Sequence, residues 1–256
     1  MMRVNRLREM LDKNDSPLFG IFMNYATQRQ VELVGHLGFD WVLLDAEHDG
    51  LTVEQAYSLV IAAENVGMGT VVRVPANTPD SLLAYAETGA NCIIAPHVMS
   101  AASASTLVSS LSFPPSGTRG LGAGSRAANY GVTQTPKEYF SAQSHAMPAA
   151  LLEDVSAYDD LDDILAVPGL EVCCLGTGDL SGSLGIPGEY SHPSVMKRAE
   201  DATKRILAAG KVISSSVSDG AGAKKAADAG HRLIACSNSG LLVGASRTYL
   251  AQAREG

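Results

Sequence analysis

The sequence predicts a (β/α)8 barrel that forms a single domain over residues 1–256. Eight short apolar runs recur along the chain, and each has the length of one strand. The runs are almost continuously apolar, which is typical of parallel strands that are buried on both faces. Between most of them lies a segment with helical periodicity that ends at a glycine just before the next run, as at a helix-to-strand junction. Eight such units in about 250 residues favour the closed barrel over an open doubly wound sheet.

The elements follow one another in a regular order along the chain. The expected strands cover residues 18–23, 40–45, 70–74, 92–96, 149–153, 172–176, 211–215 and 232–236. Clear helical patterns lie between them in VELVGHLGFD, LLAYAETGAN, RILAAGKV and KKAADAGHR. Residues 1 to about 14 alternate charged residues with Met and Leu and predict a short N-terminal helix. Residues 111–137 are rich in glycine and proline and predict a long functional or interface loop.

Composition and charge exclude several classes of protein. The 27 acidic residues outnumber the 19 basic ones and give a net charge of −8, which argues against a nucleic-acid partner. The chain has no apolar run of about 18 residues and no apolar leader, so we expect neither a membrane span nor a secretion signal. The four cysteines lie in apolar runs without CxxC spacing, as expected for reduced, buried thiols in a cytoplasmic protein.

The catalytic residues of α/β barrels lie where the strands end, so the residues after each apolar run are the candidates for a site. The second run ends in LLDAEHDG, which places His48 among three carboxylates. A strand-tip imidazole suits a general base, although a surface histidine in an acidic loop has the same pattern. Arg73 lies inside TVVRVP and needs an anionic partner. This partner is either a substrate group, or Asp45 or Glu47 in a structural ion pair.

Two further carboxylates, Glu153 and Asp179, follow consecutive strands. Neighbouring like charges at one edge of a barrel need a cation, and their hard oxygens suit Mg²⁺ or Mn²⁺. In the alternative interpretation, Asp179 caps the helix that begins at Leu180, and Glu153 or Asp154 is a solvated loop acid. The segment GTGDLSGS is a glycine-rich junction whose backbone N–H groups can bind a small anion, but it lacks the lysine of a P-loop. His97 either lines the same opening or packs behind it.

Several of these segments together resemble one known family. WVLLDAEHDG, TVVRVPANTPD, IIAPHV, FPPSGTRGLG, LLEDVSAYDDLDDIL and LGTGDLSGSLG, in this order, resemble the HpcH/HpaI aldolase/citrate lyase family of class II pyruvate aldolases. The resemblance runs from about Gly20 to the last strand. It implies a (β/α)8 barrel that reversibly cleaves 4-hydroxy-2-oxo acids into pyruvate, or a related 2-oxo acid, and an aldehyde through an enolate stabilised by Mg²⁺, Mn²⁺ or Co²⁺. It also implies a homohexamer that exchanges its last helix between subunits, with residues 120–131 on the aldehyde side.

The resemblance also implies roles for single residues. The implied metal ligands are Glu153 and Asp179, the implied catalytic residues are His48 and Arg73, and Gly176, Thr177 and Gly178 lie where family members hold the pyruvate carboxylate. The strand-tip positions add Asp45 as a carboxylate that orients His48 and His97 as a substrate-binding residue. Glu87 is the second orienting carboxylate, on the helix where members often carry an Asp that pairs with the histidine.

The sequence departs from the family pattern at four places. Leu151 replaces a common Gln, Glu87 replaces an Asp that often pairs with the catalytic histidine, Thr177-Gly178 replaces Pro-Ala, and His97 replaces a frequent Met. These changes keep the metal ligands and the base but leave the natural substrate open. Two other functions therefore stay as alternatives. One is an acyl-CoA lyase of the citrate or malyl-CoA branch, although no basic cluster for the CoA phosphates is evident. The other is a non-catalytic barrel that binds a keto acid.

Overall fold

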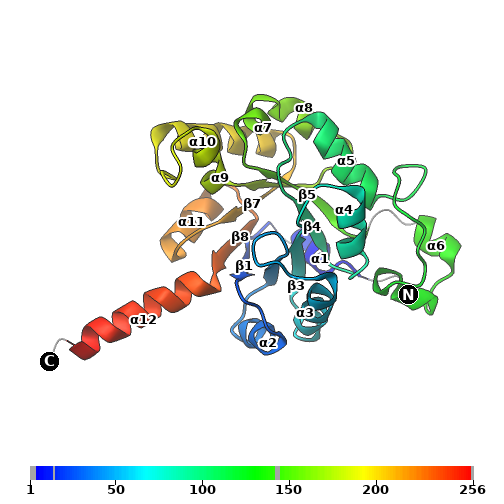
Figure 1. The fold of residues 1–256 in the computed structure, drawn as a ribbon, viewed down its shortest axis with the longest axis horizontal. Helices are drawn as coiled ribbons and strands as arrows, with labels where there is room; N and C mark the ends of the chain where they lie inside the picture. Colours follow the sequence, from blue (N-terminus) through cyan, green and yellow to red (C-terminus); the bar gives the residue numbers. More distant parts are fainter. Residues whose placement is uncertain (1–3, 14, 142–144, 255–256) are drawn as a thin grey trace.

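Eight parallel strands form a closed barrel in the computed structural model, which describes residues 4–13, 15–141 and 145–254. Helices surround the barrel (Figure 1). The predicted (β/α)8 fold is confirmed, and each strand end lies within two residues of its predicted position. The strands are β1 (Leu18–Met23), β2 (Trp41–Asp45), β3 (Gly69–Arg73), β4 (Cys92–Ala95), β5 (Met147–Leu152), β6 (Val172–Leu175), β7 (Val212–Ser216) and β8 (Leu233–Ser237).

The helices alternate with the strands, and several begin at a side-chain cap. Thr27, Thr52 and Ser100 each accept a hydrogen bond from a backbone N–H in the first turn of the helix that follows. The helices are α1 (Arg6–Lys13), α2 (Gln28–His36), α3 (Val53–Asn65), α4 (Pro79–Ala86), α5 (Ala101–Leu111), the 3-10 helix η1 (Arg126–Gly131), α6 (Pro136–Ser141), α7 (Val155–Asp159), α8 (Leu161–Leu165), α9 (Thr177–Ser183), α10 (Pro193–Ala208), α11 (Gly220–Asp228) and α12 (Asn238–Arg254).

Most strand residues are buried, as their continuous apolar sequences predict, although Phe19 of β1 is 44% exposed. One cluster of side chains, including Leu43, Val71 and Ile94, fills the barrel interior, and a larger cluster packs between the strands and the helices. Trp41 is fully buried, and its indole N–H donates to the carbonyl of Leu18 at 3.0 Å. Gly20 leaves room for this ring, because a Cβ there would lie 2.2 Å from Cε2 of Trp41.

The N-terminal helix α1 closes the amino-terminal end of the barrel. Leu7 and Leu11 are buried in the cluster that fills the barrel interior. Arg8 forms a bidentate ion pair with Glu171, with distances of 2.5 and 2.9 Å, and so ties the helix to the chain just before β6. The predicted helix over about 1–14 is thus found over Arg6–Lys13, while residues 1–3 and 14 lie outside the described residues.

The predicted long loop starts at the end of the barrel opposite the strand tips, because α5 runs back from the carboxyl end of β4. Two arginines hold this segment against the outer helices. Arg119 is 2% exposed and donates to Glu87 at 2.7 Å, and Arg126 pairs with Glu64 at the end of α3. The segment is irregular up to residue 125 and then contains η1 and the start of α6.

The last helix, α12, leaves the barrel and extends away from it (Figure 1). None of its described residues is buried, and it exposes apolar side chains such as Leu242 and Tyr249. A largely apolar groove of about 470 Å³ lies where a helix would cover β8 and β1, lined by residues that include Phe19, Phe39 and Ile234. Among the described residues, no helix is long and apolar enough to cross a membrane.

Candidate functional site

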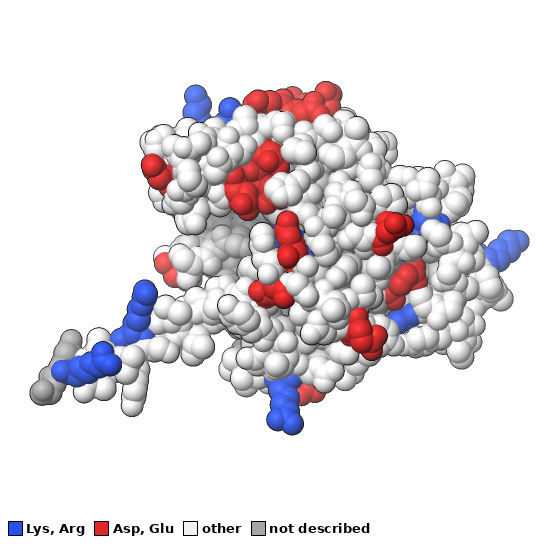
Figure 2. All heavy atoms as spheres, in the orientation of Figure 1, with Lys and Arg blue, Asp and Glu red and all other residues white. Residues whose placement is uncertain are grey.

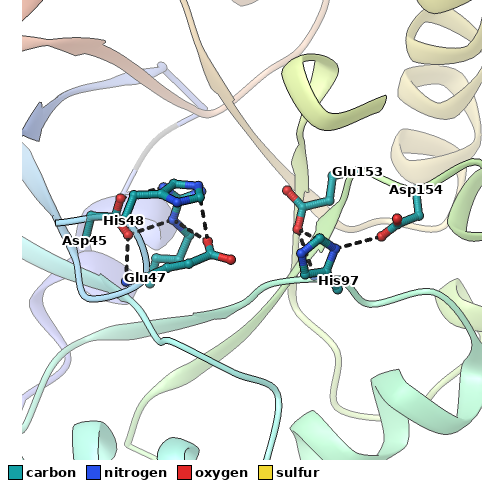
Figure 3. Close-up of polar contacts among 7 residues, drawn as sticks. Asp45, Glu47, His48, His97, Glu153 and Asp154 are labelled. Atoms are coloured by element: carbon teal, nitrogen blue, oxygen red, sulfur yellow. Dashed lines mark hydrogen bonds and ion pairs between the residues drawn. The ribbon is translucent and has the colours of Figure 1, made fainter. Parts of the chain in front are cut away.

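Polar side chains gather at the carboxyl ends of the strands in two groups (Figure 3). The first, called here the β2–β3 cluster, contains Asp45, Glu47, His48 and Arg73. The second, called the β4–β5 cluster, contains His97, Glu153 and Asp154. The two clusters influence each other electrostatically, since the charge of Glu47 acts on both Glu153 and His97. They therefore belong to one site at the barrel opening.

The β2–β3 cluster is built on a buried ion pair. Asp45 and Arg73 are direct partners in the parallel register of β2 and β3. Arg73 donates to the fully buried carboxylate of Asp45 through Nε at 2.9 Å and Nη2 at 2.5 Å, and its Nε lies 3.2 Å from Glu47. Burial disfavours the charge of Arg73, but the hydrogen bond and the charge of Asp45 outweigh it and raise the pKa of Arg73. The guanidinium is thus a fixed positive charge, 13% exposed, at the opening.

His48 lies at the rim of the opening, with its side chain 64% exposed. Its Nε2 is 3.8 Å from Oε2 of Glu47. Asp45 binds Arg73 and the backbone N–H of Glu47 instead of the imidazole. The structure therefore differs from the sequence-based expectation that Asp45 orients His48: Glu47 is the carboxylate beside the ring, and Asp45 positions Arg73.

Glu87 also differs from its expected place. It is the C-cap of α4, at the amino-terminal end of the barrel, while His48 follows β2 at the carboxyl end. Its carboxylate accepts hydrogen bonds from Arg119, at 2.7 Å from Nη2 and 3.3 Å from Nε. Within one copy of the chain, Glu87 therefore anchors the segment after α5 and does not orient His48.

Glu153 is the most deeply buried acid of the β4–β5 cluster, with 2% exposure. Its Oε1 accepts a hydrogen bond from the backbone N–H of His97 at 2.8 Å. Burial, helped by the charges of Asp179 and Glu47, raises the pKa of Glu153 to about 7, although His97 partly opposes this. A buried carboxylate with acidic neighbours is stabilised in its charged form by a cation, so these residues fit a divalent metal ion.

Gly176 leaves the space that Glu153 occupies. A Cβ at Gly176 would lie 2.7 Å from Cβ of Glu153 and 3.3 Å from its Oε2. The backbone N–H of Gly176 already donates to the carbonyl of Leu152 at 3.0 Å, so it is not available for a substrate carboxylate. Thr177 and Gly178 form the first turn of α9, where backbone N–H groups have no partner within the helix. Their predicted role in substrate binding stays a prediction.

Asp179 lies in the first turn of α9 and is exposed. This place next to a helix N-terminus favours a negative charge. Asp179 does not cap the helix as the alternative interpretation expected, because the N-cap of α9 is Gly176 and the cap makes no side-chain hydrogen bond. Its charge nevertheless reaches Glu153, because it contributes to the raised pKa of that carboxyl group. The expected metal pair is therefore close enough to interact across the β5 and β6 ends.

His97 and Asp154 complete the β4–β5 cluster. Nδ1 of His97 lies 3.0 Å from Oδ2 of Asp154 and 3.4 Å from Oε1 of Glu153. The hydrogen bond to Asp154 is the main cause that raises the pKa of His97. The sequence analysis did not select Asp154, although its position directly after Glu153 at a strand tip was the available signal. Among the described residues, these three side chains offer donor atoms within 4.8 Å of one another.

A small cavity of about 70 Å³ lies inside the opening next to Arg73. Leu151, at a position where Gln is common, contributes to its wall together with Leu43 and Ile94, while Ser214 and other β7 residues line another part. One wall is therefore apolar, and the fixed guanidinium supplies the positive charge. This arrangement suits a small anionic molecule with an apolar end.

Acidic side chains gather over the centre and upper part of the face shown in Figure 2, while Lys and Arg lie mainly at its periphery and on α12. Such a distribution attracts cations to the centre of the face.

Comparison with known proteins gives a consistent result. The model of the family described as HpcH/HpaI aldolase/citrate lyase matches residues 18–241. A 2-dehydro-3,6-dideoxy-6-sulfogluconate aldolase from Pseudomonas putida is 35% identical over 80% of this chain and 79% of that protein. A hydroxypyruvate/pyruvate aldolase from Roseobacter denitrificans is 30% identical over 99% of this chain and 98% of its own. A solved structure of a family protein from Burkholderia cenocepacia superimposes with a TM-score of 0.90 at 28% identity, over 98% of this chain and 100% of that one.

Proposed function

Because this chain belongs to the HpcH/HpaI aldolase/citrate lyase family, we propose that it reversibly cleaves 4-hydroxy-2-oxo acids into pyruvate, or a related 2-oxo acid, and an aldehyde. The predicted enzyme class agrees with the relatives, which are aldolases at 30–35% identity over most of the chain. The observation that carries the proposal is the buried Glu153, a carboxylate that needs a cation, in the same opening as the fixed charge of Arg73.

A divalent ion is the cofactor that we propose for this reaction. Glu153 and Asp179 would hold it, and it would neutralise the negative charge that develops on the 2-oxo group as the carbon–carbon bond breaks. Mg²⁺, Mn²⁺ and Co²⁺ all accept carboxylate ligands. The buried position of Glu153, with its raised pKa, supports this assignment, since a bound cation offsets the cost of a buried charge.

Three residues of the chain would carry out the remaining steps. Arg73, held by Asp45, presents a positive charge to the developing oxyanion without any reorganisation during the reaction. His48 is exposed at the rim and would take the proton from the 4-hydroxyl during cleavage and return it during condensation. Glu47, 3.8 Å from the ring, is the carboxylate placed to orient it. Gly176, Thr177, Gly178 and His97 would surround the 2-oxo acid.

We also propose that the protein works as a homo-oligomer, a hexamer by family resemblance, in which α12 packs on a neighbouring subunit. Two features support this. The helix exposes Leu241, Leu242, Val243 and Leu250, and the groove over β8 and β1 is largely apolar. Exchange of α12 between copies would bury both surfaces at once. The four cysteines are free thiols, three of them buried, which supports a cytoplasmic location.

Pyruvate release from a panel of 4-hydroxy-2-oxo acids tests the proposed function. The protein is stripped of metal and then resupplied with Mg²⁺, Mn²⁺ or Co²⁺, and Glu153→Gln and His48→Ala are compared with His36→Ala, which changes an exposed histidine of α2. We expect metal-dependent release that Glu153→Gln abolishes, that His48→Ala reduces and that His36→Ala retains. Release by stripped protein would contradict the metal mechanism. Cleavage of CoA thioesters alone would favour the lyase alternative instead.

A further inference from the structure

Two ionisable side chains next to Glu153 have no role in the proposed reaction beyond lining the site. His97 follows β4 and Asp154 follows Glu153 after β5, so both lie on the same two strand tips as the buried acid. Nδ1 of His97 points at both carboxylates, at 3.0 Å from Oδ2 of Asp154 and 3.4 Å from Oε1 of Glu153 (Figure 3). Glu153 itself is almost completely buried, so its carboxyl oxygen faces these two side chains and not the solvent.

The separations between Nδ1 of His97 and the two carboxylate oxygens lie in the range found between ligands of one metal ion. With metal–ligand distances of about 2.1 Å, neighbouring ligands of an octahedron lie about 3.0 Å apart and opposite ones about 4.2 Å. The two measured separations from Nδ1 are 3.0 and 3.4 Å, and all three donor atoms lie within 4.8 Å of one another. The ring is 55% exposed, so Nε2 can carry the ring proton toward solvent. When an ion binds, Nδ1 would release the proton that it shares with Asp154 and offer its lone pair.

The backbone conformation of His97 places both its N–H and its ring next to Glu153. Its φ of +51° lies in the left-handed region of backbone conformation. Residues other than glycine rarely adopt this region, and those that do are often found at functional sites. In this conformation the N–H of His97 binds Oε1 of Glu153 at 2.8 Å while the ring turns toward the same oxygen. His97 thus binds Glu153 through its main-chain N–H and places a ring nitrogen beside the same carboxyl group.

We propose that His97 and Asp154 join Glu153 as ligands of the divalent ion, so that the site contains an imidazole nitrogen and binds Co²⁺ in preference to Mg²⁺. The inference rests on the proposed function in one respect, the presence of an ion at Glu153. It deepens that proposal because two carboxylates alone do not select strongly among these ions. Imidazole nitrogen suits first-row transition ions, whereas Mg²⁺ prefers oxygen ligands and retained water.

The replacement His97→Gly removes the ring alone. Glycine adopts positive φ without strain and keeps the backbone N–H that binds Glu153. The affinities of metal-free protein for Co²⁺ and for Mg²⁺ are measured by calorimetry, and Mn²⁺-loaded protein is examined by electron spin echo spectroscopy for modulation from a coordinated ¹⁴N. His36→Ala is the matched control for nonspecific binding by surface histidines. His97→Asn, which also tolerates positive φ, serves as a second variant if the glycine variant does not fold.

We expect His97→Gly to weaken Co²⁺ binding about 10- to 100-fold and Mg²⁺ binding less than about threefold, and to remove the ¹⁴N modulation. Asp154→Asn should also weaken Co²⁺ binding. The proposal is overturned if the ¹⁴N modulation persists in His97→Gly, or if both ions lose affinity equally. If no ion binds in a Glu153-dependent way, both this proposal and the metal mechanism fail. Loss of Co²⁺ binding in His97→Gly in a protein that cleaves no hydroxy-oxo acid would refute only the proposed function.

Discussion

The replacement Asp45→Asn tests whether the buried ion pair with Arg73 stabilises the fold and also positions the guanidinium for its proposed role in catalysis. Asparagine keeps the shape of the side chain and one hydrogen-bond acceptor but removes the negative charge. Among the described residues, the guanidinium then keeps Glu47, at 3.2 Å, as its close anionic partner. Because Arg73 is 13% exposed, water replaces the lost partner poorly.

The expected loss of stability follows from this geometry. Two opposite charges about 4 Å apart attract each other by about 4 kcal/mol at an effective dielectric constant of about 20. Breaking a buried pair from one side costs about 3–5 kcal/mol, and Glu47 retains part of the attraction, so we expect a loss of about 3 kcal/mol in the free energy of unfolding. For a chain of this size, that loss lowers Tm by about 6–12 °C.

Thermal unfolding of Asp45→Asn, Arg73→Met and the double variant measures the effect. The double variant should be more stable than the sum of the two single losses implies, by about 2 kcal/mol, because it leaves no unpaired charge. At a temperature where the single variant is folded, kcat for cleavage should fall at least about 10-fold, since Arg73 is no longer held in place. Losses that add within about 0.5 kcal/mol would show that Asp45 and Arg73 are not coupled, and the reasoning would be wrong.

The remaining predictions concern three other parts of the molecule. Gly176→Ala should displace Glu153 and reduce the metal affinity, measured by calorimetry, at least about 10-fold. The control Gly182→Ala has open space around it and should keep the affinity. Equal affinities of the two variants would contradict the close packing of Gly176 against Glu153. Burial lowers the pKa of His231, so the folded state binds fewer protons than the unfolded state below about pH 6.5, and stability should fall as the pH drops. His231→Gln should reduce this loss of stability, measured by denaturant unfolding between pH 7.5 and 5.5. An unchanged dependence of the free energy of unfolding on pH would contradict the prediction. Leu242→Asp should decrease the mass measured by light scattering, and a wild-type mass would exclude a role of this face of α12 in assembly.

The fold could be predicted from the sequence because the patterns that determine it are local. Continuous apolar runs, helical periodicity and glycines after helices all act within about fifteen residues, and together they determine the alternation of strands and helices. The same reasoning selected the strand tips as the region of the site. It left Asp45 as a partner of either Arg73 or His48, because that choice depends on the register between β2 and β3, which is a property of two strands together.

Other features of the site depend on backbone geometry or on contacts far apart in the sequence. The ring of His97 reaches Asp154 only through its positive φ, and no residue pattern in IIAPHV indicates that conformation. Glu87 looked suited to orient a histidine, but its place at the end of α4 brings it to Arg119, 32 residues later. The apolar residues of α12 have the composition of an ordinary packed helix, so only the family resemblance, and no residue pattern, indicated that this helix leaves its own barrel.

The position of Trp41 gives the protein a built-in optical reporter. It is the only tryptophan of the chain, so the long-wavelength fluorescence of the folded protein comes from this one indole. The ring packs over Gly20 of β1, whose neighbour on the other side is Ala235 of β8, at the seam where the first and last strands close the barrel. Gly20 and Ala235 also line the groove left open beside α12. Emission recorded during dilution would therefore report, without any added dye, whether the contact between β1 and β8 loosens if the proposed oligomer dissociates.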